Sequence, residues 1–432
     1  MEFLFHGATD FDEPGLFVSF EEGAEDLVEN FRCMGFDLSR LVQEKRLKIS
    51  YVELAREQIV ETGEFTLDAL LIRLRAAVAE VGAKRVVLDT MGNLFSAVSN
   101  TSTLRKEVSR LLRWFKDEGL TCVLTGERGT ETLTKYGFED YVSDCVILLD
   151  HRVQENISKR RLRVIKYRGS THGKDEYPFL IGARGFSVFP ITSSALDHTV
   201  NDRRVSTGVA ALDAVFEGKG YFRGSTVLIS GKAGTGKSTL AAAFAAAACE
   251  RGERAVYLAF EESPAQLERN MRSVGIELGR WREEGLLDIQ ALRPTSLGLE
   301  EHLIGIMNFI EEFQPDCVIM DPVSNFLAVG AVSEVKSMLT RVLDHLKSRG
   351  LTQVLTALTP GSGQDNETEA NVSSLVDTWL ALEQEPVGHT HRRGLYIIKS
   401  RGMDHSHDTH ELVMSSDGLS LRNLQHQEEP RS

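Results

Sequence analysis

Short apolar runs rich in β-branched residues alternate with longer amphipathic stretches along most of this chain. Runs of four or five such residues are typical of strands buried on both faces of a parallel sheet, and the stretches between them suit crossover helices. We therefore predict an α/β fold with mostly parallel sheets. The predicted strands are 16–20, 85–88, 121–125, 163–166, 226–230, 256–260, 317–320, 353–357 and 395–399, and the predicted helices are 240–249, 264–274, 300–313 and 333–349.

The pattern is an internal repeat. Phe20-Glu21-Glu22 recurs 240 residues later as Phe260-Glu261-Glu262, and further matches follow in the same order at spacings of 232 and 233 residues. These further matches pair 86–89 with 318–321, 142–144 with 375–377, and 165–169 with 398–402. Since 432 residues also exceed one ordinary core, we predict two domains, 1–192 and 193–432, joined by a linker at about 190–204.

Residues 231–238 read Gly-Lys-Ala-Gly-Thr-Gly-Lys-Ser, a complete phosphate-binding loop between a predicted strand and a predicted helix. In such a loop successive backbone N–H groups and the helix N-terminus face the phosphates. Lys237 is expected to reach the β- and γ-phosphates, and the Ser238 hydroxyl to hold Mg²⁺. The sequence therefore predicts binding of ATP with Mg²⁺. The expected nucleotide-binding residues of the loop are Gly231, Lys232, Ala233, Gly234, Thr235, Gly236, Lys237, Ser238 and Thr239.

The first copy lacks its loop in the chain as given. At the spacing of 240 residues Met1 corresponds to Ala241, inside the helix that follows the loop. The first domain is therefore expected to be incomplete at its N-terminus, with two unpaired sheet edges where the loop strand belongs. We expect a start internal to a longer reading frame, and the alternative is a shortened domain that packs on its twin. In either case this chain should bind one ATP.

Composition narrows the function. The formal net charge of −14 and the pI near 5.4 disfavour a protein that grips nucleic acid. No run is apolar enough to span a membrane and no signal peptide is present, so a cytoplasmic protein is expected. The five cysteines are scattered without a Cys-x-x-Cys pair, which favours reduced thiols.

Charged residues follow several predicted strands, where α/β folds place their sites. Asp321 ends a strand and is expected to hold Mg²⁺ through water. Glu261 and Glu262 follow another strand, and one of them is expected to polarise a hydroxyl or water, although a solvated pair that caps the next helix is the alternative. Lys399 and Arg401 are expected to neutralise a γ-phosphate in the same subunit or across an interface, and surface charge is the alternative.

With these motifs the chain resembles the KaiC family of circadian clock ATPases and autokinases, over about 11–421. The most specific stretches are 11–15, 20–22, 141–144, 168–172 and 204–208. The resemblance implies two RecA-like domains per subunit, a double ring of six subunits, and ATP bound between neighbouring subunits. It also implies protein signalling partners, while the acidic composition and the lack of a long apolar run favour neither nucleic acid nor a membrane as a partner.

The resemblance assigns roles by position. Glu261 and Glu262 match the catalytic glutamates of the second domain, and Glu21 and Glu22 those of the first. Asp89 and Asp321 match the Mg²⁺-linked acids. The cations expected to contact ATP on the adjacent subunit are Lys166, Arg168, Lys399 and Arg401. The phosphorylation sites fall on Ser373 and Ser374.

Three departures qualify the resemblance. The family pair of phosphorylation sites is Ser-Thr, whereas this chain has Ser-Ser at 373–374. Pro322 stands where the family usually has serine, and the chain ends soon after Leu421 without the tail that binds the activator KaiA, so we expect no activation by KaiA.

Three functions stay open. The first is a serine/threonine autokinase with slow ATPase activity, in signalling or clock-like regulation. The second is a nucleotide-switched signalling scaffold without kinase activity. The third is a recombinase-like, DNA-dependent ATPase, against which the acidic balance argues.

Overall fold

The computed structural model describes residues 1–52, 67–92, 101–129, 132–135, 137, 139–154, 157–182, 185–188, 201–359, 372–387 and 390–423. Contacts divide the chain into unit 1, Met1–Arg152 with Arg160–Phe189, and unit 2, Val153–Lys159 with Pro190–Ser432. Most of the predicted linker lies outside the described residues. Each unit has its own α/β architecture.

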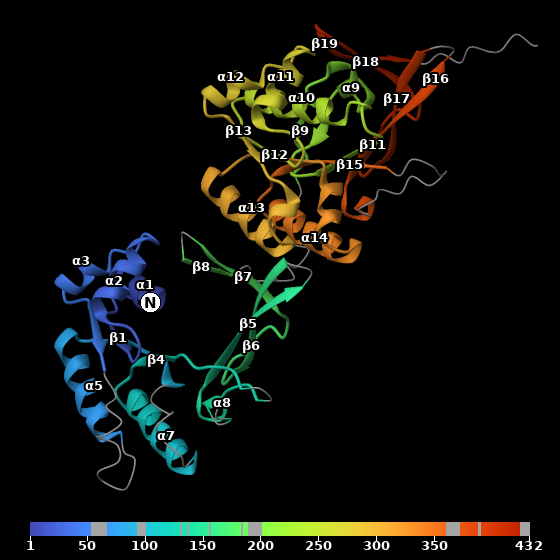
Figure 1. Ribbon diagram of the computed structural model, residues 1–432. Helices are drawn as coiled ribbons and strands as arrows, with labels where there is room; N and C mark the ends of the chain where they lie inside the picture. The colour runs from blue at the N-terminus through green and yellow to red at the C-terminus, as the bar shows by residue number, and fades with distance from the viewer. Residues whose placement is uncertain are drawn as a thin grey trace, which may run out of the picture. The chain divides into compact units, whose positions relative to one another are not determined.

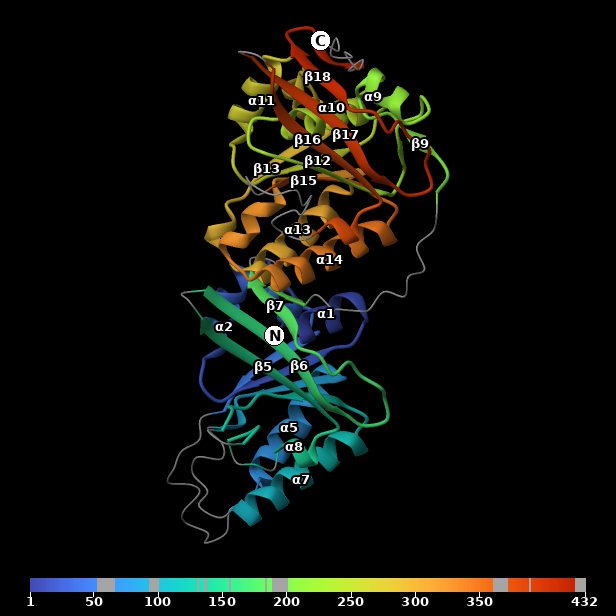
Figure 2. The ribbon, with the colours of Figure 1, turned by 90° about the vertical axis from the view of Figure 1, so that its right-hand side faces the viewer.

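Unit 2 is built on one sheet of nine strands in the order β13-β12-β14-β15-β11-β16-β17-β18-β19. Its first six strands in this order run parallel, and β16 starts an antiparallel extension. Figure 2 shows this extension as the red strands. The strands are β11 (Thr226–Gly231), β12 (Ala255–Ala259), β13 (Leu287–Ala291), β14 (Cys317–Asp321), β15 (Thr352–Leu358), β16 (Thr378–Val387), β17 (Thr390–Ser400), β18 (His410–Ser415) and β19 (Gly418–Asn423).

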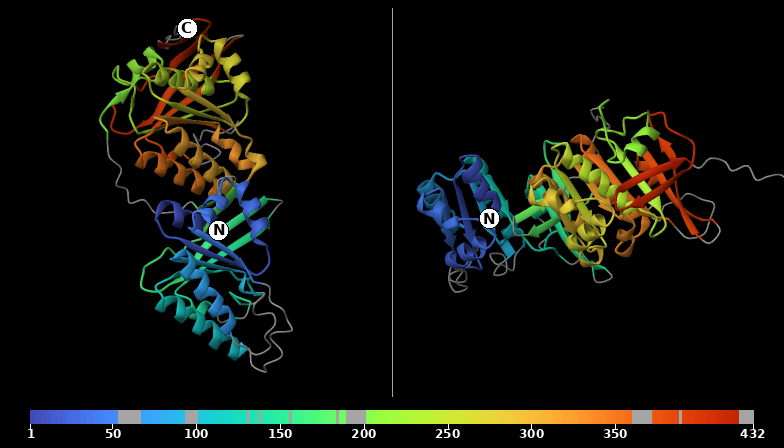
Figure 3. Two further views of the ribbon diagram at one scale, coloured as in Figure 1. Left: turned by 90° about the vertical axis from the view of Figure 1, so that its left-hand side faces the viewer. Right: turned by 90° about the horizontal axis from the view of Figure 1, so that it is seen from above.

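Helices cover both faces of this sheet (Figure 1; Figure 3). One face carries α9 (Ala210–Val215), α10 (Lys237–Glu250), α11 (Pro264–Arg272) and α12 (Leu278–Glu283), whose apolar side chains share one cluster with Val227 and Ile229. The other face carries α13 (Leu299–Phe313) and α14 (Val332–Ser348). Both faces of β11, β12 and β14 are therefore buried along their whole length, which is why most of their residues are apolar. The remaining elements of unit 2 are β9 (Arg204–Val205), β10 (Tyr221–Phe222), η1 (Pro294–Ser296), η2 (Val323–Ala328) and η3 (Ser373–Leu375).

Unit 1 repeats part of this plan. Its parallel sheet has the order β2-β1-β3-β4, with α1, α2 and α3 packed on one face and α5 and α7 on the other. A second sheet, β5-β6-β7-β8, contains the later strands. The helices are α1 (Glu2–Asp10), α2 (Ala24–Arg32), α3 (Leu38–Gln43), α5 (Asp68–Val81), α7 (Thr101–Asp117) and α8 (Glu139–Val142). The strands are β1 (Gly15–Ser19), β2 (Leu47–Tyr51), β3 (Arg85–Asp89), β4 (Thr121–Leu124), β5 (Cys145–Gln154), β6 (Ile157–Tyr167), β7 (Tyr177–Gly182) and β8 (Gly185–Val188).

The two units differ where the loop strand belongs. In unit 2, β11 lies between β15 and β16 and pairs with both. Within the described part of unit 1, no strand lies between β4 and β5, as the repeat register predicts. Ile147 and Leu149 on β5 are 55% and 51% exposed, whereas their counterparts Leu380 and Leu382 on β16 are 0% and 1% exposed. Unit 1 therefore keeps the apolar side chains that flank a loop strand in its twin.

The prediction of tandem α/β units with mostly parallel sheets is confirmed, and most predicted elements lie within one or two residues of the observed ones. The predicted strand 395–399 is longer, Thr390–Ser400, and runs antiparallel to β16. The edge strands β2 and β13 were not predicted, because their half-buried, polar-interrupted patterns resemble loops.

Candidate nucleotide-binding site

The phosphate loop connects β11 directly to α10, and its glycines shape it. Gly234 and Gly236 have φ values of 78° and 103°, a left-handed region that favours glycine. A Cβ on Gly231 would lie 2.4 Å from the Leu382 carbonyl oxygen, so a side chain cannot fit where β11 meets β16. The Thr235 hydroxyl donates to the Lys232 carbonyl at 2.9 Å and closes the turn. The loop thus arrives at the N-terminus of α10, the position that favours a bound anion.

Lys237 lies inside this loop. Its Nζ donates to the carbonyls of Gly231 and Lys232, at 2.9 and 2.8 Å. The side chain is buried, and burial lowers the pKa of its ammonium, while the charges of Asp321 and Glu261 oppose that shift. Two neutral carbonyls are weaker partners for this buried ammonium than charged oxygens, so Lys237 is well placed to exchange them for phosphate oxygens.

Asp321 ends β14 beside the loop and is held from both neighbouring strands. The Tyr257 hydroxyl of β12 donates to Oδ2 at 2.6 Å, and the Thr356 hydroxyl of β15 donates to Oδ1. In unit 1 the Thr125 hydroxyl donates to Asp89 in the same way. Neither Tyr257 nor Thr356 was predicted as a site residue, because one polar side chain within an apolar strand reads as core.

The two glutamates after β12 differ in their surroundings. The charge of Glu261 opposes the lowering of the Lys237 pKa, so this carboxylate lies within electrostatic range of the loop lysine. The Glu262 carboxylate accepts a hydrogen bond from the Asn270 amide at 3.0 Å, within α11. The N-terminus of α11 is capped by Ser263, whose hydroxyl accepts a hydrogen bond from Gln266 N–H, and not by the two glutamates. In unit 1 the N–H groups of Glu21 and Glu22 both donate to the Ser19 hydroxyl.

Lys399, Arg401, Ser373 and Ser374 gather at the other end of the sheet. Because β16 runs parallel to β11, the η3 turn before it lies beside the start of β11, and the loop lies beyond the end of that strand. Ser400 pairs with Thr378, so β17 ends at the same end of the sheet as η3. A strand of six residues spans about 20 Å. The four side chains are therefore brought together, but away from the loop of their own subunit.

Direct contacts tie this second group together. Lys399 Nζ donates to the Ser373 carbonyl at 3.1 Å, and burial lowers the pKa of this lysine, with Arg401 adding to the shift. Arg401 lies 3.8 Å from the Asp377 carboxylate, which also accepts the Thr226 N–H at the start of β11. Ser374 is exposed and Ser373 half-buried, so both hydroxyls lie near the surface.

Unit 1 has the same arrangement of cations. Lys166 Nζ donates to the Asp140 carbonyl at 2.7 Å, and Arg168 donates to the Tyr141 carbonyl at 2.8 Å. Asp140 and Tyr141 occupy the positions of Ser373 and Ser374 in the repeat. Unit 1 therefore repeats the way in which unit 2 holds its cations.

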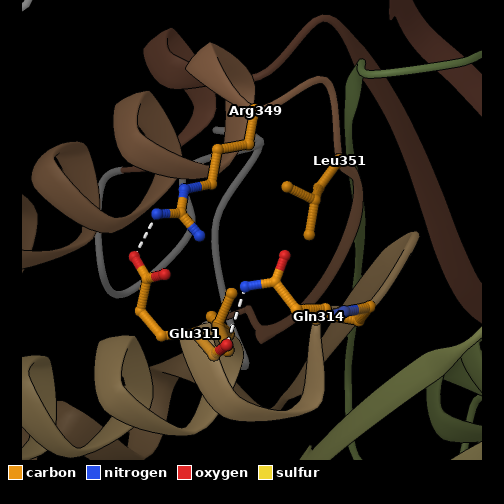
Figure 4. Close-up of a pocket in the computed structure, with 6 residues that line it drawn as sticks. Glu311, Gln314, Arg349 and Leu351 are labelled. Carbon is orange, nitrogen blue, oxygen red and sulfur yellow. Dashed lines mark hydrogen bonds and ion pairs between the residues drawn. The ribbon is translucent and has the colours of Figure 1, made fainter.

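A separate pocket of about 490 Å³ lies at the ends of α13 and α14 (Figure 4). Glu311 of α13 and Gln314 just after that helix line it on one side, and Arg349 and Leu351 line it from the segment after α14. These residues precede β14 and β15, at the end of the sheet where these parallel strands begin, whereas the loop follows the other end of β11. The pocket is therefore not part of the phosphate site.

The phosphate loop, the strand-end aspartate and the parallel sheet define a P-loop nucleotide-binding ATPase. Among the described residues, no cluster of three or more His, Cys, Asp or Glu forms a metal site independent of the loop. No helix within the described ranges combines the length and apolar character that crossing a membrane requires.

Comparison with known proteins specifies the family. The family model of the KaiC ATPase matches residues 1–193 and again 205–425. The chain is 48% identical to the circadian clock protein KaiC2 of Synechocystis sp. over 423 residues, which cover 98% of this chain and 74% of that relative. It is 34% identical to the circadian clock oscillator proteins KaiC of Acaryochloris marina and Synechococcus elongatus, with 82% of each relative covered. The chain belongs to the KaiC family, and its tandem units are the two RecA-like domains of that family.

Proposed function

We propose that this ATPase is an autokinase, in which ATP held by the loop of one subunit phosphorylates Ser373 or Ser374 of the next subunit in a ring. The observation that carries the proposal is the placement of these serines about 20 Å from their own loop, at the opposite end of β11. Transfer within one subunit would have to cover the whole length of β11. Lys399 and Arg401 lie with the serines at this end of the sheet, which we call the acceptor edge (Ser373, Ser374, Lys399 and Arg401). The acceptor edge thus also supplies cations for a neighbour's triphosphate.

The loop is the part that binds ATP. Its N–H groups and the N-terminus of α10 receive the β- and γ-phosphates, and Lys237 leaves its two loop carbonyls for phosphate oxygens. The Ser238 hydroxyl and the Asp321 carboxylate are hard oxygen donors that suit Mg²⁺. When bound, this ion neutralises charge that the β- and γ-phosphates share.

Glu261 acts as the general base. Its carboxylate takes the proton of a neighbour's serine hydroxyl, the hydroxyl oxygen bonds to the γ-phosphorus, and the bond to the departing ADP breaks. Water in place of serine gives slow ATP hydrolysis by the same steps. The Glu262 carboxylate is engaged by the Asn270 amide, so it is the weaker candidate for the base.

This assignment implies a homohexamer that acts in signalling or clock-like regulation, with protein partners that read its phosphorylation state. All five cysteines are free thiols, which suits the reducing cytoplasm. A scaffold switched by ATP binding alone is the other candidate. The hydrogen bond of Lys399 to the Ser373 carbonyl favours it, because a neighbour's ATP that attracts this lysine would change the acceptor edge without phosphorylation.

Incubation with γ-labelled ATP tests the proposal. We expect label on Ser373 or Ser374, lost in a Ser373→Ala, Ser374→Ala double variant and strongly reduced in Glu261→Gln. Glu262→Gln serves as the matched control and should keep more activity than Glu261→Gln. ATP hydrolysis without any labelled serine would replace the autokinase by the scaffold.

A further inference from the structure

Asp321 has a hydrogen-bond donor that the other unit lacks. Tyr257 is fully buried in β12, and its hydroxyl donates to Asp321 Oδ2 at 2.6 Å. A buried hydroxyl costs free energy unless it is hydrogen-bonded, so this contact satisfies Tyr257 as well as the aspartate.

The sheet register sets this contact. Ala259 of β12 pairs with Asp321 of β14, so Tyr257, two residues earlier, is the diagonal neighbour of the aspartate on the same face. Thr356 approaches from β15, on the other side of β14, and donates to Oδ1. The carboxylate is therefore fixed from both adjacent strands, and the charge of Asp321 acts on Lys237 in the loop.

Both donors are neutral. Tyrosine and threonine hydroxyls are uncharged donors, and each gives one hydrogen bond to the Asp321 carboxylate. Such donors orient a carboxylate without cancelling its charge, which is the usual task of groups behind a metal-linked ligand.

The repeat provides an internal comparison. In unit 1, Thr125 takes the place of Thr356 beside Asp89, but Phe17 takes the place of Tyr257. The threonine donor is therefore common to both units, whereas the tyrosine donor belongs to unit 2, where it stands behind the aspartate beside the loop 231–238. Phe17 also shows that a phenylalanine packs at this position of the fold, where it is 2% exposed.

We propose that Tyr257 is a positioning residue that directs the Asp321 carboxylate toward the Mg²⁺ of bound ATP and sets the Mg²⁺ requirement of unit 2. This inference rests on the Mg²⁺ role proposed above for Asp321. Tyr257 acts through the aspartate, to which its hydroxyl donates.

Tyr257→Phe tests the inference in the full-length chain. ATP affinity is measured by calorimetry across a series of Mg²⁺ concentrations and again with the metal chelated. We expect the Mg²⁺ concentration that gives half of the affinity gain to rise about tenfold. Affinity for metal-free ATP should stay that of the wild type, which a general loss of structure would not allow.

Tyr221→Phe is the matched control, because Tyr221 is also buried in the unit 2 core but packs on Phe216 and Phe244. It should keep the wild-type Mg²⁺ dependence. A Tyr257→Phe chain with wild-type Mg²⁺ dependence overturns the inference and leaves the proposed metal role intact. A wild-type chain whose ATP affinity ignores Mg²⁺ overturns both.

Discussion

Replacing Gly231 by alanine tests whether the junction of β11 and β16 sets the shape of the phosphate loop. An added Cβ would meet the Leu382 carbonyl oxygen at 2.4 Å, the Thr235 hydroxyl at 2.9 Å and the Leu382 Cβ at 3.1 Å. The first of these is backbone and cannot rotate away. Because Gly231 pairs with Leu382, the strand end or the loop after it must shift.

The magnitude follows from this crowding. Overpacking of this kind costs about 1–3 kcal/mol of the free energy of unfolding. If relaxation moves the loop, about 1.4 kcal/mol of that strain appears as a roughly tenfold loss of ATP affinity. The Gly231→Ala chain should therefore show both effects.

Urea unfolding and calorimetric titration with ATP measure the two quantities. Gly305→Ala is the control, since Gly305 lies within α13, exposed and with nothing within 4 Å of an added Cβ. Its replacement should stabilise the chain by about 0.5–1 kcal/mol and leave ATP affinity unchanged. Wild-type stability and affinity in Gly231→Ala would refute the description of the loop.

Three further predictions concern protons and stoichiometry. Burial lowers the pKa of Lys237, and bound phosphate should raise it. At a pH between the pKa of the free and of the ATP-bound protein, binding should therefore take up protons, and ATP affinity should weaken as pH rises through that range. Calorimetry in buffers of different ionisation enthalpy detects this proton uptake. Burial also lowers the pKa of His302, whose Nε2 lies 2.9 Å from the Pro294 carbonyl. The unfolded chain therefore binds more protons, and the free energy of unfolding should fall as pH drops through 6.5. Urea unfolding at about pH 5 and about pH 7.5 measures this fall, which His302→Gln should reduce. This chain has one phosphate loop and should bind one ATP, and a calorimetric stoichiometry of two would contradict the repeat register.

Sequence reasoning located the parallel cores and the loop because their signals are local. An apolar core, 227–229, precedes the loop, and the glycine spacing in 231–238 indicates a backbone path that a side chain at Gly231 would block. The repeat was also visible in the sequence, because its register fixes which segment of one unit each residue of the other matches.

Other features depend on contacts between distant segments. The orientation of β17 depends on its pairing with β16, and an apolar strand pattern is the same for either direction. The direction of β16 places Ser373 and Lys399 away from the loop of their own subunit. The sequence does not show this direction, so it left open whether Lys399 acts in its own subunit or in a neighbouring one. Tyr257 was missed because its value lies in one hydroxyl that meets Asp321, 64 residues away.

Transfer between subunits is tested most directly by mixing two defective chains. A Lys237→Ala chain keeps Ser373 and Ser374 but loses the lysine that holds ATP, and a Ser373→Ala, Ser374→Ala chain binds ATP but has no acceptor. After subunit exchange with γ-labelled ATP, the account predicts label on the Lys237→Ala chain, although neither chain alone becomes labelled. An unlabelled mixture, formed from subunits that demonstrably assemble together, would contradict it.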